Sequence, residues 1–60
     1  MDAKKADFEL VNLLMLTENA NECFGAWLTS ENPEFLATVK LYIKRIEQQL
    51  NAVKTEMEIT

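Results

Sequence analysis

Hydrophobic residues in the second half of the chain recur at alternating spacings of three and four. They are Leu36, Val39, Ile43, Ile46, Leu50, Val53 and Met57. This a/d heptad pattern is typical of a helix that packs one apolar stripe against another helix. Asn32 caps such a helix, Pro33 suits its first position, and Glu34 complements the positive end of its dipole. The pattern predicts a helix over about 33–58, with Ser30 as a rival cap.

The first half has the same alternation on a broader apolar surface. Its main stripe consists of Ala3, Ala6, Leu10, Leu13, Thr17, Ala20, Phe24 and Trp27, and Phe8, Val11, Leu14, Met15, Leu16, Cys23, Ala26 and Leu28 widen it. A stripe this broad indicates contact with more than one neighbouring helix. We predict one continuous helix over about 3–29. A break near 17–21 is the alternative, because Asn19 and Glu22 have the spacing of a capping box and Gly25 disfavours a helix interior.

A short polar link over about 29–33 separates the two predicted helices. Short connections join antiparallel neighbours, so the sequence predicts an all-α fold in which residues 1–60 form a single two-helix antiparallel hairpin. The scarcity of turn residues, with one Gly and one Pro, agrees with few, long helices.

The predicted hairpin needs additional stabilisation, since chains of 60 residues bury only a modest share of their surface. A single cysteine excludes an intrachain disulfide, and a chain without histidine has no pattern typical of a structural zinc site. Association with another chain is the remaining source of stability. We expect two hairpins to form a homodimeric four-helix bundle. The expected interface comprises Leu10, Leu13, Phe24, Trp27, Leu36, Val39, Ile43, Ile46, Leu50 and Val53. The packing topology and the choice between a dimer and a higher oligomer stay open.

Charge is distributed unevenly along the chain. The net charge is −4; residues 1–32 hold two lysines and six acidic residues, whereas residues 33–60 hold four basic and four acidic residues. An acidic surface disfavours nonspecific nucleic-acid binding and favours solubility. No stretch approaches the roughly 20 apolar residues of a membrane span, and no signal-peptide pattern follows Lys4 and Lys5. We therefore expect no membrane partner and a cytoplasmic location, with Cys23 reduced and packed as a small hydrophobe.

Two groups of residues are candidate binding sites. Phe8, Val11 and Met15 lie off the main stripe; they are a docking site for a partner protein if a dimer leaves them exposed, and core if four helices enclose them. Lys40, Tyr42, Lys44 and Arg45 are a candidate nucleic-acid patch, in which cations and an aromatic ring would contact phosphates and bases. The alternative for this second group is a solvated helix face stabilised by local ion pairs, for example between its lysines and the nearby Glu47.

Catalytic chemistry is missing from the sequence patterns. We find no histidine, no GxSxG motif and no glycine-rich phosphate loop, and no set of residues that would hold a metal or a cofactor. We therefore expect a protein that is not an enzyme and that binds no cofactor.

The predicted organisation resembles the Rop-type bundle of plasmid copy-number control: similar length, two long helices, a tight polar turn and an antiparallel dimer. In that family an acidic protein binds paired RNA loops through one helical face, so the resemblance implies RNA binding as an alternative function. In size and style the chain also resembles small accessory proteins of temperate phages and prophages. Our main expectation is a regulatory protein-interaction module that acts as an inhibitor or adaptor.

Overall fold

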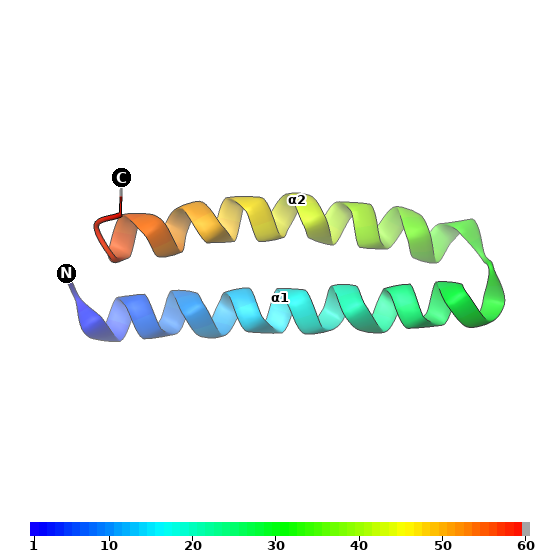
Figure 1. The fold of residues 1–60 in the computed structure, drawn as a ribbon, viewed down its shortest axis with the longest axis horizontal. Helices are drawn as coiled ribbons and strands as arrows, with labels where there is room; N and C mark the ends of the chain where they lie inside the picture. The colour runs from blue at the N-terminus through cyan, green and yellow to red at the C-terminus, as the bar shows by residue number, and fades with distance from the viewer. Residues whose placement is uncertain (60) are drawn as a thin grey trace.

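The computed structural model describes residues 1–59 and contains two helices, α1 (Ala3–Ser30) and α2 (Pro33–Glu56). The helices lie side by side and antiparallel over their whole length, with the turn at one end and both termini at the other (Figure 1). The predicted all-α helical hairpin is thereby confirmed. Its Cα atoms extend over 43 × 17 × 11 Å, so the molecule is a flat rod with two broad faces.

Both helices begin at side-chain caps. The Asp2 carboxylate accepts hydrogen bonds from the backbone N–H groups of Lys4 and Lys5, at 3.1 and 3.3 Å. The Asn32 side-chain oxygen accepts one from the N–H of Glu34 at 3.0 Å, and Pro33 follows the cap as predicted. These contacts satisfy donors that the first turn of a helix leaves without a partner.

Both helices end where a glutamate adopts a left-handed backbone. Glu31 has φ 56° and its N–H donates to the carbonyl of Trp27 at 2.7 Å. Glu58 has φ 59°, and the next N–H, that of Ile59, donates to the carbonyl of Lys54. The second pattern is a Schellman motif. It ends α2 at Glu56, two residues before the predicted boundary, and α1 extends one residue further than predicted.

Helix α1 continues without interruption through residues 17–21, as the main prediction had it. Asn19 and Glu22 lie within the helix and do not form a new start. Gly25 is helical too, and a Cβ atom placed on it would meet nothing within 4 Å. No packing contact in the hairpin therefore requires a glycine at this position.

The core between the helices is small. Only Ala6, Ala20 and Val53 are buried among the described residues, and no large side chain is fully buried. The larger inward residues are half-buried: Leu13, Leu16 and Trp27 of α1, and Leu36, Val39, Tyr42 and Ile46 of α2. The hairpin thus shields few of its hydrophobic side chains from water.

A polar contact fixes the register of the two helices. The side-chain amide of Gln49 donates to the backbone carbonyl of Glu9 at 2.9 Å and to the Glu9 carboxylate, and both residues are half-buried. Counting along the antiparallel helices from this contact, we infer that Leu13 lies opposite Ile46 and that Ala20 lies opposite Val39. The amino group of Met1 and the Glu58 carboxylate form an exposed ion pair at 2.7 Å across the open end of the hairpin.

Candidate interaction surface

Residues spaced by seven form a row along the contact between the helices. This inner row is the most buried part of the hairpin and consists of Ala6, Leu13, Ala20 and Trp27 on α1 and of Val39, Ile46 and Val53 on α2. Five of these seven residues belong to the predicted oligomer interface. In the hairpin they instead contribute to packing within one chain.

A second row of the same heptad pattern lies beside the inner row and is largely open to solvent. We call it the apolar face: Leu10, Thr17 and Phe24 on α1, Leu36, Ile43 and Leu50 on α2, and Met57 directly after α2. Leu36 is half-buried, whereas the other large hydrophobic residues of the row expose 38–47% of their surface. The structure therefore places four residues of the predicted interface, Leu10, Phe24, Ile43 and Leu50, on solvent-exposed positions.

The helical repeat explains why both halves of the apolar face lie on one side of the hairpin. Each of its residues follows an inner-row residue by four positions or precedes one by three, as Leu10 does between Ala6 and Leu13. With 3.6 residues per turn, each residue of the apolar face is therefore rotated about 40–60° around its helix axis from the direction that points to the other helix. Because the helices are antiparallel, equal rotations about their axes turn both rows to the same side.

The other flank of the helix contact has a different composition. Glu9, Leu16 and Cys23 of α1 and Tyr42 and Gln49 of α2 are half-buried there, and the Gln49–Glu9 hydrogen bonds join the two sides. Sequence reasoning missed Glu9 and Gln49, because hydrophobic periodicity carries no signal for a polar pair inside a helix contact. Cys23 is half-buried, which agrees with its predicted packing as a small side chain.

Further hydrophobic residues lie on the outer side of α1. Phe8, Val11 and Met15, the predicted docking residues, expose 63%, 45% and 55% of their surface, and Leu14 next to them exposes 56%. In the single hairpin α2 leaves them largely uncovered. Whether a partner covers them stays a prediction.

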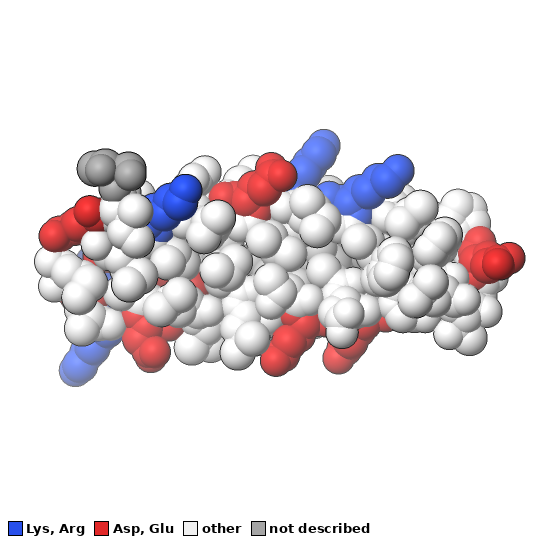
Figure 2. Space-filling view, in the orientation of Figure 1, with Lys and Arg blue, Asp and Glu red and all other residues white. Residues whose placement is uncertain are grey.

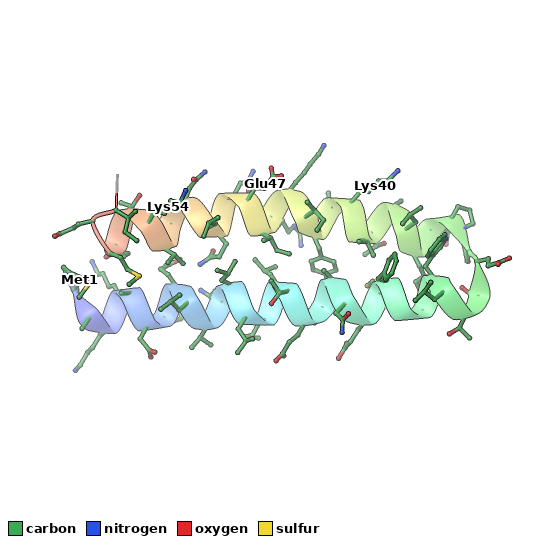
Figure 3. The ribbon with its side chains drawn as sticks, viewed as in Figure 1. Met1, Lys40, Glu47 and Lys54 are labelled. Atoms are coloured by element: carbon green, nitrogen blue, oxygen red, sulfur yellow. The ribbon has the colours of Figure 1, made fainter. Side chains whose placement is uncertain are left out.

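Charged side chains avoid the middle of the broad face seen in Figure 2. They project along both long edges and at the ends, and the middle of the face between them is largely uncharged. On the edge of α2 lie Lys40, Glu47 and Lys54, which are spaced by seven and point away from α1 (Figure 3). Each follows a residue of the apolar face by four positions, so these charges border that face.

The structure does not bring the four residues of the predicted nucleic-acid patch together. Lys40 and Tyr42 are two positions apart and thus about 200° apart around α2. Tyr42 is half-buried on the flank of the helix contact, while Lys40, Lys44 and Arg45 are exposed. The Arg45 guanidinium lies 5.9 Å from the centroid of the Tyr42 ring, a cation–π contact within α2.

A shallow hollow beside this contact is lined by Thr38, Leu41, Tyr42 and Arg45. It is well below the size of roughly 300–1,000 Å³ that is usual for small-molecule sites. Within residues 1–59, no group of three or more His, Cys, Asp or Glu side chains is placed to hold a metal ion. Neither helix contains, in the described part of the chain, a segment long and apolar enough to cross a membrane.

No family model, curated protein or solved structure matches this chain. Its class is therefore defined by its fold and surface alone. It is an all-α helical hairpin with a heptad-based apolar face that residues 1–59 leave partly exposed.

Proposed function

We propose that this protein is a non-catalytic interaction module that packs its apolar face against helices of another protein chain and thereby regulates that chain or an assembly that contains it. The observation that carries the proposal is the exposure of a regular heptad row: Leu10, Phe24, Ile43, Leu50 and Met57 expose 38–47% of their surface in a chain with only three buried residues among those described.

The physical argument is one of stability. A helix pair with so few buried side chains gains little from the hydrophobic effect, while ordering the chain costs about 1–2 kcal/mol per residue. Covering the apolar face with further helices supplies the missing burial. Contiguous exposed hydrophobic surface of this kind marks protein interaction sites.

The alternative, binding to RNA or DNA through α2, has weaker support. Lys40, Tyr42, Lys44 and Arg45 spread around the helix, and the cation of Arg45 lies near a ring of its own chain. The net charge of −4 opposes phosphate binding as well.

A pair of matched substitutions on α2 tests the proposal. Leu50 lies on the apolar face and Leu41 lies on the outer side of the same helix; they expose 41% and 53% of their surface in the single chain. If a partner helix covers the face, Leu50→Gln buries an amide at a helix contact and lowers the free energy of unfolding of the associated protein by about 2–4 kcal/mol per chain. Leu41→Gln changes it by less than about 0.5 kcal/mol, as is usual for an exposed site.

Chemical denaturation followed by circular dichroism measures both variants against the parent chain. A larger effect at Leu50 than at Leu41 supports a covered face. Equal, small effects for the two variants, with the parent chain folded as a monomer, would contradict the proposal, because the hairpin would then be stable without a partner on its apolar face.

A further inference from the structure

We propose that the apolar face is covered by a second copy of this chain, which lies antiparallel to the first so that the two turns are at opposite ends of a four-helix bundle. This inference rests on the proposed function and names its partner. Four properties of the hairpin support it: the area of its face, the symmetry of its heptad rows, the sizes of its inner residues and the charges that border the face.

The area of the face suits a dimer. The broad face measures 43 × 17 Å between Cα extremes, a projected rectangle of about 700 Å² on each copy, which indicates the scale of the surface that it can bury. Stable protein interfaces bury about 800 Å² per partner. One further hairpin of equal length therefore covers the face completely and leaves no end of it exposed.

Twofold symmetry allows two ways to stack the apolar faces. With the turns at opposite ends, α1 packs on α1 of the second copy and α2 on α2. With the turns at the same end, α1 packs on α2 of the second copy. In the first arrangement the symmetry axis passes the middle of the face, where Thr17 and Ile43 of both copies meet.

Side-chain size favours the opposite-end arrangement. Large and small pairs alternate along the inner row: Ala20 and Val39 form a small layer, and Leu13 and Ile46, seven residues away, form a large one. A symmetry axis near Thr17 brings the small layer of one copy to the level of the large layer of the second copy. Each layer of the four-helix bundle then combines one small pair with one large pair, so the layers have nearly equal volume. Equal layers are the condition for a core without voids or overpacking.

The same-end arrangement would instead place equal layers together. Ala20 and Val39 would meet their own copies in an underfilled layer, and Leu13 and Ile46 would meet theirs in a crowded one. Both voids and overpacking destabilise a core. Large pairs of one copy thus meet small pairs of the second copy only in the opposite-end arrangement.

The charged residues that border the apolar face also fit the opposite-end arrangement. In the opposite-end arrangement Lys40 lies next to Glu47 of the second copy, and by symmetry Glu47 lies next to Lys40 of the second copy. These two reciprocal pairs of opposite charge lie at the edge of the apolar contact. In the same-end arrangement Asp7 would instead pair with Lys54 of the second copy, and Glu47 would lie beside the apolar Leu14. The two arrangements therefore differ in which charges are adjacent, and this difference can be tested.

Charge reversal distinguishes the two arrangements. We expect Lys40→Glu alone and Glu47→Lys alone to weaken the homodimer, because each places like charges side by side twice. An equimolar mixture of the two variants restores opposite pairs. We expect heterodimers to exceed the statistical amount by roughly threefold to thirtyfold, the effect of two exposed ion pairs. Native mass spectrometry of isotopically distinguished chains measures the ratio.

The matched control is a mixture of Lys5→Glu and Glu22→Lys. These substitutions change the net charge equally but lie on exposed positions of α1 away from the apolar face. Statistical mixing of the control together with heterodimer preference of the test pair supports the proposal. Equal preference in both mixtures, or statistical mixing in both, would overturn the opposite-end arrangement.

A thiol at the symmetry axis provides a second measurement. In a Cys23→Ala background, Thr17→Cys places the two thiols next to each other in the opposite-end dimer, so oxidation yields a disulfide-linked dimer. Asn21→Cys is the control, since its copies lie too far apart for a disulfide. Equal cross-linking of the two variants, or none at position 17, would contradict the arrangement.

The parent chain separates failure of this inference from failure of the proposed function. A monomer with little helix at all concentrations would exclude the second copy while leaving the face to a different chain. A stable helical monomer in which Leu50→Gln and Leu41→Gln have equal effects would overturn both.

Discussion

Two glutamates hold the left-handed backbone at which the helices end. A residue other than glycine pays about 1–2 kcal/mol for this conformation, because its Cβ atom approaches the following carbonyl oxygen. At Glu31 an acidic side chain also lies at the negative end of the α1 dipole, which is unfavourable. The turn is therefore not optimised for stability at Glu31.

We predict that Glu31→Gly raises the free energy of unfolding by about 0.5–1 kcal/mol, which is the relief of strain minus the added entropy of the unfolded chain. Glu31→Ala removes the same carboxylate but keeps a Cβ atom, so it should stabilise less. Thermal unfolding at matched chain concentration measures both. Equal stability of the two variants would show that the effect of Glu31 is electrostatic rather than conformational.

At the scale of the helices, α1 tolerates a glycine without a structural reason for it. A Cβ atom at Gly25 would meet nothing within 4 Å, and the position lies away from the apolar face. Alanine is favoured over glycine in a helix interior by about 1 kcal/mol.

We therefore expect Gly25→Ala to raise the free energy of unfolding by about 1 kcal/mol per chain, equivalent to a rise in Tm of roughly 4–8 °C for a domain of this size. The reverse substitution Ala37→Gly, at an exposed position of α2, should lower it by a similar amount. A loss of stability in Gly25→Ala would mean that another chain approaches α1 closely at this residue.

Heptad periodicity and the Asn32-Pro33 cap predicted both helices, their antiparallel order and the start of α2. They did not predict which hydrophobic row faces the other helix of the same chain, because heptad positions a and d are both apolar here. The end of α2 was placed two residues late, since the left-handed conformation is adopted by Glu58 and not by the glycine that usually marks it. The Gln49–Glu9 contact has no sequence signal.

At the scale of the whole molecule, the hairpin separates its hydrophobic residues into two rows with different tasks. The inner row holds α1 and α2 together but buries only Ala6, Ala20 and Val53. The apolar face contains larger side chains and is open. A chain with this distribution gains most of its hydrophobic burial by association, so folding and binding should be one process.

Sedimentation equilibrium of the parent chain, paired with helical circular dichroism over a dilution series, tests this coupling most directly. We predict a helical dimer at micromolar concentration that loses mass and helicity together on dilution. A chain that sediments as a monomer and keeps its full helicity at every concentration would contradict the account, because the inner row alone would then be sufficient for folding.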